Sequence, residues 1–185
     1  MSMPTREEAW EVLCEYNQDE FHLKHARTVE SIMRWFAKKD GFENEEDFWG
    51  IAGLLHDLDF EKYPEEHCIR VQEIMKEKGW DERLIHAVAS HGYGITVDVK
   101  PEHLMEKTLF TIDELSGLIG AAVLVLPTKD IHDLQLKTVK KKFKDKRFAA
   151  GCSRDIISRG CEMLGRPLDD VMADTLAAMQ ENPID

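Results

Sequence analysis

Apolar residues recur at helical spacing along nearly the whole chain, and this pattern limits the possible folds more than any other feature. Thr5 and Glu8 have the spacing of a capping box at the start of a helix. Asn44 precedes three acidic residues that suit the positive end of a helix dipole. Gly41 and Gly79 follow helical stretches and can adopt the left-handed conformation that ends a helix. We therefore predict an all-α protein.

These capping residues and glycines, together with the prolines, give approximate helix limits. Beyond the first helix, which opens at Thr5, the predicted helices cover 19–39, 44–57, 64–78, 81–91, 101–126, 153–164 and 169–180, with a loop at 92–99. A chain of 185 residues fits one domain, and no stretch resembles a long linker. We expect a single helical domain over 1–185, with a metal-site core at about 19–126 and C-terminal helices at 138–180.

Composition narrows the cellular setting. The longest apolar run, about 118–126, is far shorter than the ~20 residues of a membrane span. The first residues, MSMPTREEAW, lack the apolar segment of a secretory signal. The 4 cysteines show no CxxC spacing, which favours reduced thiols and argues against a zinc–thiolate site. We predict a cytoplasmic protein that does not bind membranes, and no feature of the sequence specifies an oligomeric state.

Charge is distributed unevenly. The net charge of −12 predicts no bulk binding of nucleic acid or anionic membrane. Residues 137–147, KTVKKKFKDKR, reverse this pattern with seven basic residues and one acid. The segment is either a solvated helix face or a local positive field beside an anionic substrate. In the second case Lys144, Lys146 and Arg147 are candidates to bind a substrate phosphate.

The pair His56-Asp57 is the main candidate for chemistry. An imidazole nitrogen and a carboxylate oxygen can bind the same divalent cation, but two ligands are too few to hold it. His25 and Asp113 are the distant candidates for the remaining ligands. Gly50 and Gly53 lie on the helix face that carries the pair, where small residues let helices approach closely; ordinary tight packing around a polar cluster is the alternative explanation.

The local contexts of these four residues resemble the HD-domain superfamily of metal-dependent phosphohydrolases. The resemblance covers HARTV around His25, IAGLLHD before Asp57, TIDELSGLI around Asp113, and the order of the three segments. It implies a compact helical bundle of the HD type in which His25, His56, Asp57 and Asp113 bind a divalent metal. It also implies hydrolysis of a phosphate ester or phosphoanhydride in a small nucleotide or another phosphorylated metabolite.

A second ion is implied by HD proteins with two metals, which carry further histidines after the His-Asp pair. His67 and His91 occur in that order here, and Asp57 would then bridge two ions. Mixed nitrogen and oxygen ligands favour iron, manganese, cobalt, nickel or zinc over calcium. His86 lies five residues before His91, about 140° around a helix, and is expected to be structural.

Residues after the pair are candidates for catalysis alongside Asp57. In related proteins an acid or a lysine at this place transfers protons or binds phosphate, which suggests Glu61 and Lys62. Their other interpretation is a solvated loop before Pro64. Two further functions remain open at this point: a di-iron oxygenase on the same scaffold, and a regulatory module that binds metal without catalysis.

Overall fold

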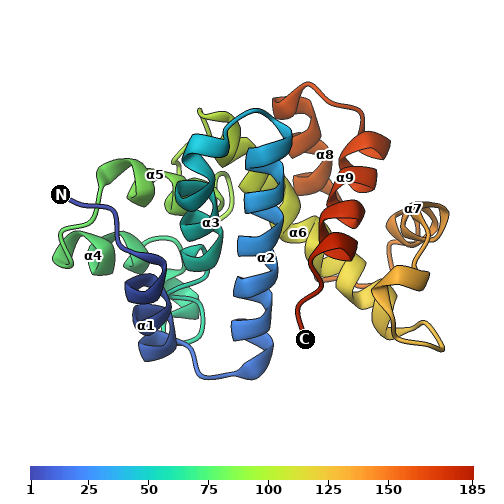
Figure 1. The fold of residues 1–185 in the computed structure, drawn as a ribbon, viewed down its shortest axis with the longest axis horizontal. Helices are drawn as coiled ribbons and strands as arrows, with labels where there is room; N and C mark the ends of the chain where they lie inside the picture. Colours follow the sequence, from blue (N-terminus) through green and yellow to red (C-terminus); the bar gives the residue numbers. More distant parts are fainter.

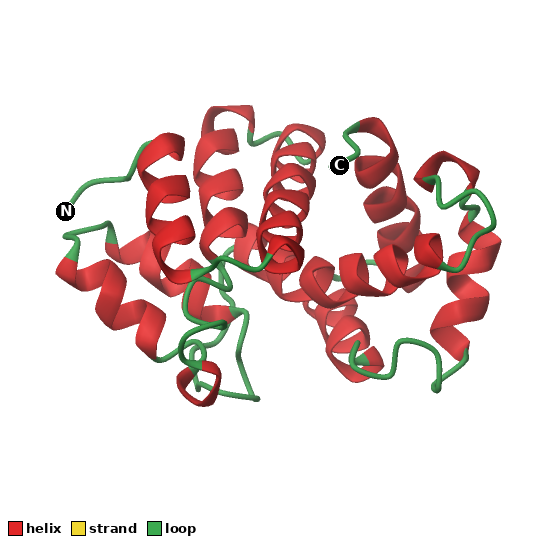
Figure 2. Cartoon of the chain, turned by 90° about the horizontal axis from the view of Figure 1, so that it is seen from below, coloured by secondary structure: helices red, strands yellow, loops and turns green.

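The chain is described by a computed structural model of residues 1–185, and it is helical throughout. Nine α-helices are joined by loops and three short 3-10 helices, and no strand is present (Figure 2). The all-α prediction is confirmed. The helices are α1 (Arg6–Tyr16), α2 (Glu20–Lys39), α3 (Glu46–Leu55), α4 (Arg70–Glu77), α5 (Glu82–Ser90), α6 (Leu104–Leu124), α7 (Leu136–Lys144), α8 (Arg154–Leu164) and α9 (Leu168–Glu181).

Helix α2 stands at the centre of the molecule (Figure 1). Asp19 caps its N-terminus by accepting the backbone N–H of Phe21, and the helix packs against α3, α6 and α9. Gly53 explains the close approach of α3, since a Cβ there would lie 2.9 Å from Met33 Cγ and 3.0 Å from the Val29 carbonyl oxygen. The glycine on the face of the His-Asp pair therefore serves tight helix packing beside that pair.

Two groups of buried apolar residues form the interior. The first surrounds α2 and α3, and the second lies among α6, α7, α8 and α9. Helix α6 belongs to both: Leu109 and Ile112 are in the first core, and Leu115 and Leu118 are in the second. No helix in the structure combines the length and the apolar character that a membrane span requires.

Several predicted helix limits were wrong. Asn44 lies inside a 3-10 helix, Glu43–Glu45, and caps nothing with its side chain. Pro64 opens another 3-10 helix, so α4 begins only at Arg70. Helix α6 starts after His103, which accepts the backbone N–H of Met105, and not at Pro101. Short 3-10 helices replace the expected helix starts at Asn44 and Pro64, whereas a capping box between His103 and Glu106 sets the start of α6.

Asp174 ties α9 to the rest of the structure. Its carboxylate pairs with Lys39 at the end of α2 and with Arg166 in the turn before α9. Burial raises the pKa of Asp174, but the hydrogen bonds from Lys39 and Arg166 outweigh it and lower that pKa below the ordinary value. The ionised carboxylate is therefore the form that the fold stabilises.

We expect Asp174→Asn to lower the free energy of unfolding by about 1–3 kcal/mol, since two charge-assisted hydrogen bonds weaken. The contribution is present above the ordinary aspartate pKa of 3.8 and is lost as the pH falls through the lower folded value. Urea unfolding at neutral pH and near pH 3 measures the effect. An equal difference between the two proteins at both pH values would contradict this assignment.

Candidate metal centre

His56 and Asp57 follow directly after the last residue of α3. The His56 side chain is fully buried, and its Nδ1 lies 2.7 Å from the Gly53 carbonyl oxygen. Because a carbonyl oxygen can only accept, Nδ1 carries the proton and the lone pair of Nε2 is free. That nitrogen faces Asp57, with Nε2 3.2 Å from Asp57 Oδ2. The orientation suits a metal ligand held by a backbone contact.

The structure brings the four residues of the primary set together. His25 Nε2 lies 3.2 Å from His56 Nε2 and 2.9 Å from Asp113 Oδ1. Asp113 Oδ1 is 3.2 Å from His56 Nε2, and Asp57 Oδ2 is 3.6 Å from His25 Nε2. The side chains of His25, Asp57 and Asp113 remain 20–23% exposed, so solvent reaches the group. These residues come from α2, the end of α3, and the middle of α6.

A second group lies on the other side of Asp57. His67 Nε2 and His91 Nε2 are 3.2 Å apart. Asp57 Oδ1 is 3.4 Å from His67 Nε2 and 3.6 Å from His91 Nε2. The two oxygens of one carboxylate therefore face two different pairs of histidines, as expected for a ligand shared by two ions.

Contacts at Nδ1 orient both histidines of the second group. His67 Nδ1 lies 2.7 Å from Asp59 Oδ1, and His91 Nδ1 lies 2.5 Å from the Val88 carbonyl oxygen. Asp59 is fully buried, and its other oxygen accepts the backbone N–H of Val71. Both Nε2 atoms are thereby left to face Asp57. A carboxylate behind a ligating histidine is a common support in metal sites.

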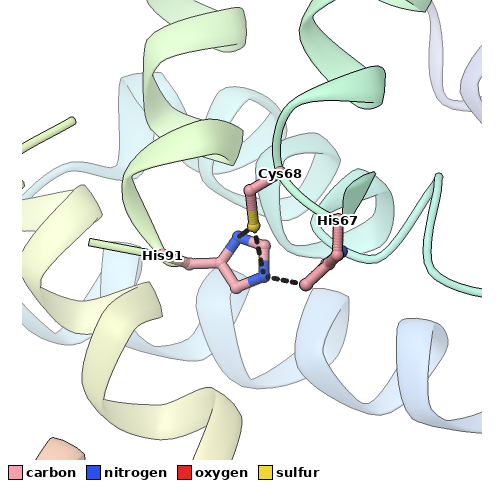
Figure 3. Close-up of side chains that lie close together, drawn as sticks. All are labelled: His67, Cys68 and His91. Atoms are coloured by element: carbon pink, nitrogen blue, oxygen red, sulfur yellow. Dashed lines mark hydrogen bonds between the residues drawn. The ribbon is translucent and has the colours of Figure 1, made fainter. Parts of the chain in front are cut away.

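Cys68 also lies beside this group, which sequence reasoning missed because a lone cysteine gives no ligand spacing. Its backbone has a positive φ of 65°, and its sulfur lies 3.7 Å from Nε2 and 3.8 Å from Nδ1 of His91. Nearly equal distances place the sulfur alongside the imidazole (Figure 3) and not beyond Nε2, where an ion would bind. We therefore do not count Cys68 as a ligand.

The electrostatics of the centre favour a bound cation. Burial lowers the pKa of His56, but the charges of Asp57 and Asp113 outweigh it and raise that pKa to about 10. Burial likewise raises the pKa of Asp113, but His56 and His25 bring it below the ordinary value. Buried carboxylates among imidazoles need compensating positive charge, which either protons or metal ions can supply.

The donor set fits divalent metal ions. Nitrogen and oxygen donors held ~2.0–2.2 Å from one ion at tetrahedral or octahedral angles lie about 2.8–3.6 Å from one another. The closest donor pairs in both groups are 2.9–3.6 Å apart. Such mixed donors suit iron, manganese, cobalt, nickel or zinc. The distances and the exposed edge of the centre are therefore compatible with one or two such ions.

Two predicted catalytic residues lie outside this arrangement. Glu61 accepts the backbone N–H groups of Gln18 and Asp19, and its Oε2 is 3.0 Å from His22 Nδ1. Lys62 donates to the Glu15 carbonyl oxygen at 2.6 Å. Glu61 thus contacts the connection between α1 and α2, and Lys62 contacts the last turn of α1. The structure does not bring them into the ligand group, and their catalytic roles stay predictions.

The predicted substrate-binding residues lie at and after the C-terminus of α7. Lys144, Lys146 and Arg147 are exposed there, outside the ligand group. His86 also lies outside it, with Nδ1 2.7 Å from Glu106 Oε1. This contact agrees with the structural role expected for His86.

Exposed aromatic side chains lie at the edge of the centre, and no sequence pattern singled them out. The Phe60 ring meets that of His67 edge-on at 5.2 Å and that of His22 at 5.7 Å. Phe21 lies 5.9 Å from His22 and one helical turn before His25. Phe21 is 72% exposed and Phe60 41% exposed, so both rings are accessible beside the candidate metal ligands.

Fold and site together define an all-helical protein with a candidate two-ion centre. The chain is similar to a curated protein, tRNA (cytidine(56)-2'-O)-methyltransferase of Picrophilus torridus, with 27% identity over 172 aligned residues. The match covers 83% of this chain and 49% of the relative, so the chain spans about half of the relative's length. No protein-family profile matches the chain, and no solved structure matches it.

This comparison corrects the family and the reaction predicted from the sequence. The relative is named for methyl transfer to RNA, so the assignment to the HD superfamily and the phosphohydrolase interpretation were wrong. The oxygenase and regulatory-module alternatives are not supported either. The physical reason is that metal ligands specify what a site can bind, whereas many reactions share the same ligands and the same fold.

The predicted partners need the same correction. A small phosphorylated substrate and the exclusion of nucleic acid both conflict with a relative named for tRNA. The exclusion relied on a net charge of −12, which averages over the whole surface. Nucleic acid responds to the local field, and a basic segment can bind it on an acidic protein.

We expect the purified protein to hold at least one transition metal ion. His56→Ala and Asp57→Ala should each reduce bound metal to a small fraction of the wild-type amount, because each removes a donor from the centre of the group. His86→Ala is the matched control and should retain the metal. Elemental analysis of the purified proteins measures the outcome, and near-stoichiometric metal in Asp57→Ala would refute the ligand assignment.

Asp59 tests the second group separately. Asp59→Asn weakens the hydrogen bond that orients His67, so the second ion should bind about 10–100-fold more weakly. The primary group contains neither residue and should keep its ion. Metal titration followed by calorimetry resolves the two steps. Equal weakening of both, or of neither, would show that Asp59 does not support the second group specifically.

Proposed function

We propose that this chain is a metal-binding domain that binds tRNA and works in tRNA modification. One or two divalent ions occupy the centre formed by His25, His56, Asp57, Asp113, His67 and His91. We place its site of action in the cytoplasm. Because about half of the relative lies outside the match, we assign tRNA binding to this chain and leave the methyl transfer unassigned.

The observation that carries the proposal is the position of the Asp57 carboxylate. Oδ2 faces His25 and His56, while Oδ1 faces His67 and His91, all at 3.2–3.6 Å. Each oxygen thus faces the Nε2 atoms of two histidines, the arrangement of a carboxylate shared by two ions. A divalent ion at such a site attracts phosphate and hydroxyl oxygens and lowers the pKa of a bound hydroxyl group.

The aromatic rim supports an RNA partner. Unpaired bases of RNA stack on aromatic side chains, and each stacked base contributes about 1–3 kcal/mol. Phe21 and Phe60 expose their rings next to His22 and His67. A nucleotide with its base against these rings would have its ribose and phosphate within reach of the metal centre. In this arrangement Phe21 and Phe60 bind the base, and the metal centre binds the ribose and phosphate oxygens.

We expect the metal-loaded protein to bind tRNA and to lose affinity when the ion is removed by a chelator. Phe21→Ala with Phe60→Ala should weaken binding roughly 5- to 100-fold, the equivalent of ~1–3 kcal/mol for a stacked base. Fluorescence anisotropy with labelled tRNA measures both effects at fixed salt.

Leu124→Ala with Val125→Ala is the matched control, because these apolar side chains are 66% and 58% exposed at the far end of α6. It should bind tRNA like the wild type. Failure of the metal-loaded wild type to bind tRNA would overturn the proposed function. Incorporation of a methyl group from S-adenosylmethionine into tRNA by this chain alone would extend it to catalysis.

A further inference from the structure

Helix α7 and the turn after it concentrate positive charge in an acidic protein. Residues 137–147 contain seven basic residues and one acid, which gives the segment a net charge of +6. Since the whole chain has a net charge of −12, the other 174 residues have a net charge of −18. A local excess of this size attracts polyanions even though the whole chain is acidic. The segment also lies at one end of the molecule, away from α4 and α5 (Figure 1).

The packing of α7 directs lysines outward. Val139 is fully buried, and Leu136 and Phe143 pack against the same C-terminal core. Lys137, Lys141 and Lys144 are exposed at the i, i+4 and i+7 positions, so they form one stripe along the helix. Neighbouring members of the stripe are about one helical turn, ~5 Å, apart.

Most of this charge has no partner within the protein. Lys140 pairs with Asp169 at 2.5 Å, and Lys142 lies over the Phe148 ring at 4.3 Å. The structure contains no ion pair for the three lysines of the stripe or for Lys146. Arg147 has one marginal contact, 4.0 Å from Asp145, and its side chain is 98% exposed. We call Lys137, Lys141, Lys144, Lys146 and Arg147 the basic platform.

Arg154 fixes the turn that carries the end of the basic platform. Its guanidinium donates to six backbone carbonyls, those of Lys142, Phe143, Asp145, Phe148, Ala149 and Cys152. These acceptors include the last carbonyls of α7, which have no partner within the helix. The turn is therefore held in one shape by a single side chain.

This turn leads directly to the metal centre. Glu114, which follows the candidate ligand Asp113, accepts the backbone N–H of Ser153 at 2.8 Å. Ser153 in turn caps α8 by accepting the backbone N–H of Ile156. The segment between the basic platform and the centre is thus anchored at both ends, by Arg154 and by Glu114.

We propose that the basic platform binds the phosphate backbone of an RNA strand that extends to the metal centre. This inference rests on the proposed function and names the surface that would hold the RNA beyond the centre. Charge complementarity supports it, because five basic side chains without strong partners suit a chain of phosphates. A membrane is a poorer partner, since amphipathic helices bind lipid through an apolar face and that of α7 is packed in the core.

The test compares Lys137→Gln/Lys141→Gln/Lys144→Gln with the wild type, both metal-loaded. RNA affinity should fall at low salt, and the slope of log Kd against log salt should decrease by about 2–3, close to one per lost phosphate contact. The matched control is Lys76→Gln/Lys78→Gln/Lys100→Gln, which removes the same charge from other exposed positions. Melting temperature and metal content should be unchanged in both variants.

Three probes separate the possible outcomes: tRNA, single-stranded poly(U) and vesicles containing phosphatidylserine. A reduced salt slope in the α7 variant alone supports the basic platform, whether the RNA is tRNA or poly(U). If the reduced slope is measured with poly(U) and the metal-loaded wild type does not bind tRNA, the basic platform stands and the proposed function fails. If tRNA binds both variants and the wild type with equal slopes, the basic platform is refuted and the proposed function stands. Binding to the vesicles but to neither RNA refutes both the basic platform and the proposed function. Binding to none of the three probes also refutes both.

Discussion

The position of the Asp57 carboxylate is the constraint on which the rest of the site depends. It must face histidines on both sides, so α2, the end of α3, the segment around His67 and the end of α5 all converge on it. Burying the carboxylates of Asp57 and Asp113 in a small volume is costly, and the arrangement becomes favourable only with compensating positive charge from protons or metal ions. Gly53 contributes to this convergence, because the absence of a side chain there lets α3 approach α2, the helix that carries His25.

Most helices could be predicted because their ends carry local signals. Asp19, Asp81 and Ser153 cap helices because their short polar side chains reach a backbone N–H of the first turn. The signals failed where another turn competed for the same residues, as at Asn44 and Pro64. Propensity cannot resolve such competition, since the outcome depends on contacts made after the chain has folded.

The candidate ligands could be placed from sequence, but their supports could not. Asp59 and Cys68 have no distinctive spacing, and their positions beside His67 and His91 follow only from the turn between α3 and α4. Glu61 and Lys62 show that closeness in sequence can also mislead. They follow the His-Asp pair within five residues, but their side chains contact Gln18 and Glu15 instead of the ligand group. The reaction could not be predicted from these residues, because the same donor atoms serve many chemistries. The comparison with a relative named for tRNA was needed to correct the predicted phosphate hydrolysis.

The spread of the ligands along the chain has a consequence for folding. His25 and Asp113 are 88 residues apart, and the other four ligands lie between them on three segments, at His56-Asp57, His67 and His91. Ions held by the two ligand groups would act as cross-links that close several long loops, so they would remove much of the conformational freedom of the unfolded chain. Metal supply would then govern how long the N-terminal core stays folded, as well as what the centre can bind.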